Sequence, residues 1–216
     1  MSSPGKSTPS DKKCVTLFGS DEITDTLCGV EFSLSPLSFY QVNSLQAQKL
    51  FTIATDLADL DENSTAVDLY CGAGAIGLIA AKRKNIKALY GVEIVPEAVE
   101  NAKSNAARNG IKKAHFICGD ASKGAAELLK MKVSPDVVFV DPPRKGCDRE
   151  TLSIAAQRMS PERIVYVSCD PATFARDAAI LKEMVYDLKK AVPVDLFPRT
   201  PHIETVGLFE RTADCV

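Results

Sequence analysis

The chain has 216 residues, of which 45% are hydrophobic and 25% are charged, values that fit one globular domain with a full core. Its net charge of -2 provides no overall positive field for nucleic acid, so RNA binding would require a local basic patch. No apolar run approaches the roughly 20 residues needed to cross a bilayer. The polar first 13 residues lack the apolar core of a signal peptide, and we interpret them as a disordered leader or a vector remnant.

Short strands are predicted at residues 14–18, 22–27 and 30–34, where glycines separate apolar runs. Asn43 is then predicted to cap an amphipathic helix that runs to about residue 60. The apolar face of this helix is predicted to contain Leu45, Leu50, Ile53, Ala54 and Leu57.

Strands and helices alternate along the rest of the chain. Strands are predicted at 65–69, 88–94, 114–118, 136–140 and 163–168, and helices at 75–83, 96–109, 122–131, 149–159 and 172–184. Two last strands, at 188–195 and 203–210, have no helix between them and are expected to pair as an antiparallel hairpin. The pattern predicts an α/β fold with a doubly wound, Rossmann-like sheet that is mostly parallel. Such sheets bind ligands at the carboxyl ends of their strands.

The cysteines favour neither a disulfide framework nor a metal site. Their number is odd, their spacing is scattered and no Cys-x-x-Cys pair occurs, so we expect a reducing, cytoplasmic setting. They are Cys14, Cys28, Cys71, Cys118, Cys147, Cys169 and Cys215.

A glycine-rich turn follows the strand predicted at 65–69. Its Gly-x-Gly-x-x-Gly spacing would let a ligand approach the free N–H groups at the start of the next helix. The spacing alone also fits NAD, but Asp68 ahead of the turn resembles the S-adenosylmethionine methyltransferase pattern. Glu93 ends the next strand, where a carboxylate can bind ribose hydroxyls. The candidate cofactor-binding residues at this edge are Gly72, Gly74, Glu93 and Asp120.

The tetrapeptide Asp141-Pro142-Pro143-Arg144 follows the strand predicted at 136–140. Its two prolines fix φ and remove two N–H donors, so we expect a rigid loop with outward-facing carbonyl groups. Amino-group methyltransferases use a similar tetrapeptide that ends in an aromatic residue. Arg144 replaces that aromatic residue, which argues against methylation of nitrogen.

Cys169 follows the strand predicted at 163–168, and Pro171 stops that strand, so the thiol is expected at the ligand-binding edge. Carbon 5 of a pyrimidine is too poor a nucleophile to accept a methyl group directly. Addition of a thiolate to carbon 6 makes carbon 5 nucleophilic, whereas methylation of nitrogen or oxygen needs no thiol. Cys169 is therefore the predicted nucleophile of a pyrimidine methyltransferase.

Glu204 lies at the start of the last predicted strand. After methyl transfer the proton on carbon 5 has to leave, and a partly buried carboxylate could remove it. Glu204 is the predicted general base and His202 is its rival, although His202 fits a substrate contact or a loop position better. Phe39 and Gln41, before the first helix, are candidates for covering a ligand or stacking on a base.

These motifs resemble the catalytic domain of the RNA 5-methyluridine methyltransferase family over about residues 21–211. The matching segments are Ser38-Phe-Tyr-Gln-Val-Asn43, Asp68-Leu-Tyr-Cys-Gly-Ala-Gly74, Gly91-Val-Glu93, Asp141-Pro-Pro-Arg-Lys-Gly146, Val167-Ser-Cys-Asp-Pro171 and His202-Ile-Glu-Thr-Val206. The resemblance implies a class I methyltransferase fold, S-adenosyl-L-methionine as cofactor, and uridine in transfer or ribosomal RNA as substrate. It implies methyl-donor contacts by Gln41, Tyr70, Glu93 and Asp141, and substrate contacts by Phe39, Asp141, Arg144 and His202.

Two departures from the family pattern matter. Asp170 replaces the usual Asn after the nucleophile, and its charge would raise the thiol pKa unless it is paired. Full-length relatives also have an RNA-binding barrel, a central domain and, in some, an iron–sulfur cluster. Only residues 14–34 resemble the end of that central domain, so residues 35–216 are expected to be the catalytic domain of a fragment or truncated homologue.

We expect a monomer without a metal or a membrane segment. Two alternatives remain open. One is methylation of cytosine or of another pyrimidine-containing target. The other is an isolated cofactor-binding catalytic fragment that is inactive without the missing RNA-binding domains.

Overall fold

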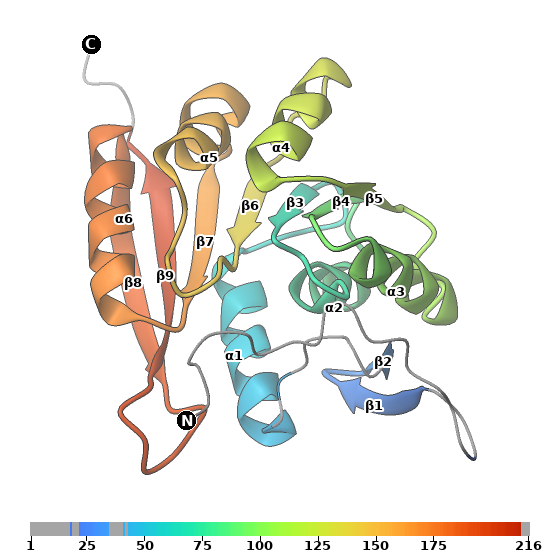
Figure 1. Cartoon of the computed structure of the whole chain (residues 1–216). Helices are drawn as coiled ribbons and strands as arrows, with labels where there is room; N and C mark the ends of the chain where they lie inside the picture. Colours follow the sequence, from blue (N-terminus) through green and yellow to red (C-terminus); the bar gives the residue numbers. More distant parts are fainter. Residues whose placement is uncertain (1–17, 19–21, 35–40, 42, 213–216) are drawn as a thin grey trace, which may run out of the picture.

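The computed structural model describes residues 18, 22–34, 41 and 43–212 (Figure 1). The leader, most of the strand predicted at 14–18, and Phe39 lie outside the described residues. The elements, in chain order, are β1 (Ile23–Leu27), β2 (Val30–Leu34), α1 (Ser44–Leu57), β3 (Thr65–Leu69), α2 (Ala75–Lys84), β4 (Ala88–Glu93), α3 (Pro96–Arg108), β5 (Ala114–Cys118), α4 (Ala121–Lys130), β6 (Val137–Val140), α5 (Arg149–Ser153), η1 (Ile154–Met159), β7 (Arg163–Ser168), α6 (Pro171–Glu183), β8 (Tyr186–Val194) and β9 (Glu204–Arg211).

The main sheet has seven strands in the order β5-β4-β3-β6-β7-β9-β8. The first five in this order are parallel, and β9 runs antiparallel to both β7 and β8. This confirms the predicted doubly wound sheet with its C-terminal hairpin. Ser168 pairs with Thr205, so β9 begins beside the point where β7 ends.

Helices cover both faces of the sheet, with α1, α2 and α3 on one side and α4, α5 and α6 on the other (Figure 1). Each covered face has its own core because successive strand residues point to opposite sides. In β7, for example, Val165 and Val167 belong to the first core, whereas Ile164 and Tyr166 belong to the second.

The hairpin of β1 and β2 forms a separate two-stranded sheet that packs on α3. The side chain of Asn105 accepts a hydrogen bond from the Ser33 N–H at 2.8 Å, and Asn109 accepts one from the Glu31 N–H at 2.9 Å. Leu27 and Phe32 of the hairpin are fully buried in the core beneath α1 and α2. The hairpin thus shares the core of the main body, and its origin in a neighbouring domain stays a prediction.

Two local predictions were wrong. Leu45 is 76% exposed, because the buried face of α1 follows the helical spacing of Ala47, Leu50, Phe51 and Ala54 and does not include it. The helix predicted at 149–159 is α-helical only to Ser153 and continues as the π-helix η1. Such wider turns are a local departure that apolar periodicity does not reveal.

Among the described residues, no helix is both long and apolar enough to cross a membrane. Within the same residues, no group of three or more His, Cys, Asp or Glu side chains is placed to hold a metal ion.

Candidate active site

The carboxyl ends of the parallel strands bring the predicted site residues to one edge of the sheet. Glu93 ends β4, Asp141 follows β6 and Cys169 follows β7. Glu204 begins β9, which enters the sheet at the same edge in the opposite direction. The described candidates from separate βα units are therefore neighbours along one edge, as expected for a sheet of this type.

The glycine-rich turn leaves backbone N–H groups available at the start of α2. Gly72 and Gly74 have φ of 54° and 88°, values that favour glycine, and α2 has no side-chain cap. Below the turn, Asp68 Oδ2 accepts a hydrogen bond from the Gly77 N–H at 2.9 Å. A Cβ on Gly77 would lie 2.9 Å from the same oxygen, so this close packing requires glycine.

Asp68 is 2% exposed, and its Oδ1 is the buried side-chain polar atom without a hydrogen-bond partner in the described part of the chain. Burial raises the pKa of Asp68 from 3.8 to about 7; the Gly77 hydrogen bond opposes this shift and the charge of Glu93 adds to it. An unpaired buried acceptor is costly, and a ligand that donates a hydrogen bond or carries positive charge would relieve that cost.

Glu93 organises the turn from the neighbouring strand. Its Oε2 accepts a hydrogen bond from the Gly72 N–H at 3.0 Å, and its Oε1 accepts one from the Val95 N–H at 2.8 Å. Each carboxylate oxygen retains a further lone pair, so these bonds leave Glu93 able to accept hydroxyl donors from a ligand.

Asn105 also holds the turn, and the sequence analysis did not find it. Its Nδ2 donates to the Ala73 carbonyl at 3.2 Å while its Oδ1 accepts from Ser33. Asn105 is fully buried on α3 and links β2 to the glycine-rich turn. Nothing local distinguishes this Asn from a solvated helix residue, because its partners are 32 and 72 residues away.

Cys169 is partly buried, and Asp170 after it caps α6. The Asp170 carboxylate accepts hydrogen bonds from the N–H groups of Ala172 and Thr173, both at 2.9 Å. These contacts, led by the bond from Thr173, lower the pKa of Asp170. The charge expected to disturb the thiol is therefore paired with the start of a helix.

The thiol of Cys169 lies among three charged or titratable groups. Burial raises its pKa first and the charge of Glu204 adds to this, whereas Arg144 lowers the thiol pKa and Asp141 raises it. Two other thiols near this edge are buried more deeply. Burial raises the pKa of Cys147 to about 12 and that of Cys71 well above its usual range.

Glu204 is 7% exposed, and burial raises its pKa while the charge of Arg144 opposes that shift. Burial also raises the pKa of Asp141 to about 8, with smaller contributions from the charges of Glu204 and Asp68. The raised pKa of Asp141 favours its protonated form, which can donate a hydrogen bond, whereas the charge of Arg144 opposes the rise in the pKa values of both the thiol and Glu204.

The remaining predicted residues lie at or beside this edge. Tyr70 has a φ of 65°, and its half-buried hydroxyl lies against Cys147 and Thr151 on the α5 side. Gln41 is partly buried just before α1, whose cap Asn43 donates to the Leu196 carbonyl near the end of β8.

Asp120 is exposed and caps α4, and a bond from the Ser122 hydroxyl lowers its pKa. His202 is exposed in the loop before β9.

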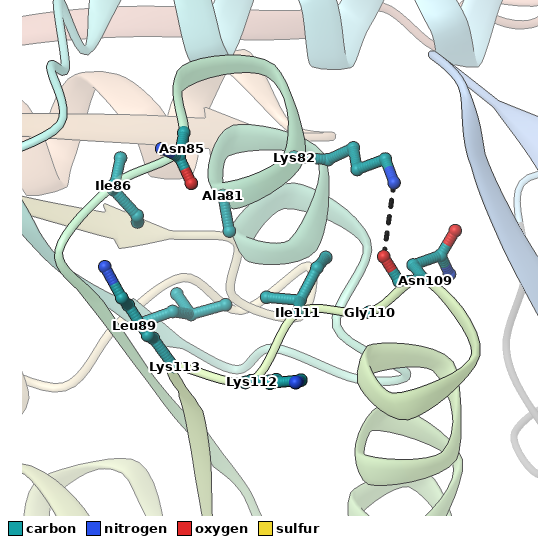
Figure 2. Close-up of a pocket in the computed structure, with 10 residues that line it drawn as sticks. All are labelled: Ala81, Lys82, Asn85, Ile86, Leu89, Asn109, Gly110, Ile111, Lys112 and Lys113. Atoms are coloured by element: carbon teal, nitrogen blue, oxygen red, sulfur yellow. Dashed lines mark hydrogen bonds between the residues drawn. The ribbon is translucent and has the colours of Figure 1, made fainter.

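A concave region of about 510 Å³ lies at the opposite edge of the sheet (Figure 2). It is lined by the C-terminal end of α2, by Asn109 and Gly110, and by Lys112 and Lys113 before β5. A hydrogen bond of 3.2 Å from Lys82 to the Asn109 carbonyl crosses it. Its lining contains no thiol, carboxylate or imidazole, whereas the candidate site residues lie at the strand carboxyl ends.

A family model and the relatives found by comparison all describe RNA methyltransferases. The family model described as tRNA (Uracil-5-)-methyltransferase matches residues 18–212. A protein of Clostridium acetobutylicum named an RNA methyltransferase is 46% identical over 197 residues, which are 91% of this chain and 42% of that protein. A Staphylococcus epidermidis protein with the same description is 47% identical over 200 residues, which are 93% of this chain and 43% of that protein.

Among solved structures, the tRNA (uracil-54, C5)-methyltransferase of Pyrococcus abyssi in complex with S-adenosyl-L-homocysteine is similar, with a TM-score of 0.75 and 33% identity. The match covers 89% of this chain and 45% of that one. The chain thus spans less than half the length of the relatives described here.

Proposed function

Because the chain belongs to the tRNA (uracil-5-)-methyltransferase family, we propose that it methylates carbon 5 of a uridine in structured RNA with S-adenosyl-L-methionine as donor. The observation that carries the proposal is the pairing of β7 with β9. This pairing brings Cys169 and Glu204 to the edge that also holds the glycine-rich turn, and their charges influence each other there.

The residues of the turn fit the proposed donor. The open side of Gly72 leaves space for its methionine end, and the start of α2, which has no side-chain cap, offers its first N–H groups. Glu93 has lone pairs for ribose hydroxyls. The unpaired oxygen of Asp68 and the charge of Glu93 suit a cationic ligand. S-adenosyl-L-methionine would supply an electrophilic methyl group carried on a sulfonium.

Cys169 is the proposed nucleophile. Its thiolate sulfur adds to carbon 6 of the uracil and forms a C–S bond, and the electron pair of the C5–C6 double bond moves to carbon 5 and the O4 carbonyl. Carbon 5 then takes the methyl group, and the S–CH3 bond of the sulfonium donor breaks with its electron pair left on sulfur, which leaves a neutral thioether. The guanidinium of Arg144 supports the thiolate, since it opposes the effects of burial and of Glu204 on the thiol pKa.

Glu204 is the proposed base for the second half of the reaction. Its carboxylate takes the carbon 5 proton, the released electron pair re-forms the C5–C6 double bond, and the C–S bond breaks to return the thiolate. Partial desolvation makes this carboxylate more basic than an exposed glutamate. Asp141 is the proposed contact to the uracil edge, and its raised pKa favours the protonated form that could donate a hydrogen bond there.

The proposed substrate is a uridine of transfer or ribosomal RNA in the cytoplasm. Residues 35–216 would form the catalytic domain, and residues 14–34 would be the end of a neighbouring domain. The alternative function is an isolated cofactor-binding fragment that cannot act on RNA alone, and the partial coverage of longer relatives favours testing it.

Trapping with 5-fluorouridine tests both functions. Fluorine on carbon 5 cannot leave as a proton does, so the wild-type chain should form an adduct with substituted transfer or ribosomal RNA that survives a denaturing gel. Cys169→Ala should form none, and Cys118→Ala, which removes an exposed thiol, is the matched control and should still form it. An adduct that survives Cys169→Ala would refute the nucleophile, and donor binding by the wild type without any adduct would select the alternative.

A further inference from the structure

A buried carboxylate on α6 joins the two segments that carry Arg144 and Cys169. Asp177 is fully buried, and its Oδ2 accepts hydrogen bonds from the Cys147 N–H at 2.9 Å and from the Tyr166 hydroxyl at 2.5 Å. Its Oδ1 accepts from Arg176 Nε at 2.8 Å. A charged side chain at such a depth needs several partners, and Asp177 has them in three segments of the chain.

Arg176 extends these contacts to the loop after β6. Its Nη2 donates to the Lys145 carbonyl at 2.9 Å and to the Cys147 carbonyl at 3.3 Å. Between these two residues Gly146 has a φ of 73°, and a Cβ there would collide with Arg176 and Asp177. The loop backbone is therefore fitted directly onto this pair of side chains.

The loop and α6 each carry a part of the proposed site. Arg144 lies next to Lys145, whose carbonyl is held by Arg176, and Cys169 lies just before α6. The bonds to the carbonyls of Lys145 and Cys147 hold the backbone of the loop that carries Arg144 against α6. An ion pair with one buried partner is weak evidence for stability by itself, so its position between two functional segments calls for another explanation.

We propose that Asp177, acting with Arg176, is a positioning residue for the covalent step, which holds loop 144–147, and with it Arg144, against the helix that follows Cys169. The inference rests on the proposed function and deepens it. After burial, the groups that shift the pKa of the thiol are Glu204, Arg144 and Asp141. Of these, Arg144 is the one that favours the thiolate, so its displacement should make the thiol less reactive at neutral pH.

Alkylation of Cys169 measures this effect without RNA. The rate of modification by iodoacetamide, followed at Cys169 by peptide mass spectrometry, should rise with pH along a titration curve. Asp177→Asn keeps the size but removes the charge that holds Arg176. We expect the midpoint of the curve to rise by about 0.5 to 1 pH unit, which is about three- to tenfold slower alkylation near neutral pH.

A second substitution separates positioning from general destabilisation. Arg144→Gln should raise the midpoint by a similar amount, and the double variant should add nothing further, because both changes remove the same interaction. Glu183→Gln is the matched control, since it removes an exposed carboxylate that pairs with Arg149 on the same helix. It should leave the midpoint unchanged.

If Asp177→Asn does not fold, Arg176→Gln removes the same loop contacts from a half-exposed position and should shift the midpoint in the same direction. An unchanged midpoint in the folded variant, or full additivity with Arg144→Gln, would overturn the proposal. If the wild type forms no adduct with 5-fluorouridine RNA, that result rejects the proposed function instead. The alkylation rate is measured without RNA and does not depend on the trapping result.

Discussion

Asp68 makes stability depend on pH in a direction opposite to that of most carboxylates. It is 2% exposed, one oxygen accepts from Gly77 and the other has no partner, and burial raises its pKa from 3.8 to about 7. Asp68→Asn keeps the shape and an acceptor for the Gly77 N–H but cannot ionise. The substitution therefore isolates the free energy of burying this charge.

The direction of this pH dependence follows from proton binding in the folded and unfolded states. Between pH 4 and 7, on the pKa values 3.8 and about 7, the unfolded state loses the Asp68 proton while the folded state keeps it. Stability then falls by about 1.4 kcal/mol per pH unit and stays flat above the folded pKa. Over the whole range the free energy of unfolding of the wild type should fall by about 4 kcal/mol relative to that of Asp68→Asn. Other groups titrate in both proteins and largely cancel in the difference.

Urea unfolding followed by circular dichroism, from about pH 4 to pH 8, measures this difference. Asp120→Asn is a control of opposite sign, because a hydrogen bond from Ser122 lowers the pKa of Asp120. For that pair the wild type should lose relative stability only as the pH falls below about 4, so the difference between the two proteins should stay nearly constant across this range. Parallel curves for the wild type and Asp68→Asn would refute the reasoning, since they would mean that the carboxyl ionises as freely in the folded state as in the unfolded one.

Two further predictions concern the proposed reaction. Glu93→Ala should weaken binding of S-adenosyl-L-methionine by about 10- to 150-fold, because it removes charge-assisted contacts and loosens the Gly72 turn. Titration calorimetry measures this, and unchanged affinity would contradict the assignment. Glu204→Gln should methylate once and then accumulate a covalent complex with RNA, because the amide cannot take the carbon 5 proton. Turnover at the wild-type rate without an adduct on denaturing gels would make His202 or a water the better candidate.

Local patterns were enough to predict the architecture. Runs of β-branched residues such as Ile164 to Val167 alternate with helical segments, which predicted a mostly parallel sheet covered by helices. The order of its strands came from the structure. The location of the candidate site followed as well, since the ends of parallel strands share one edge. That edge was predicted from the positions of the motifs at the ends of the strands.

Side-chain environments were not predictable in this way. The sequence left open whether the charge of Asp170 would disturb the thiol, and the structure pairs it with the start of α6. Leu45 is apolar and was predicted on the buried face of α1. Tertiary packing instead buries a face of this helix that contains Ala47 and Leu50. A helical period describes one element, whereas burial depends on the neighbour that covers it.

The sequence by itself therefore determined the fold class, the edge at which the candidate site residues meet and the residue types available there. Only the tertiary structure decided that Asp177 and Asn105 would hold the segments around them. Each bonds to a backbone group 30 or more residues away, and such a contact leaves no periodic or spacing signal in the chain. The partners of a buried polar group are set by which segments the packed core brings together, and that is a property of the whole fold.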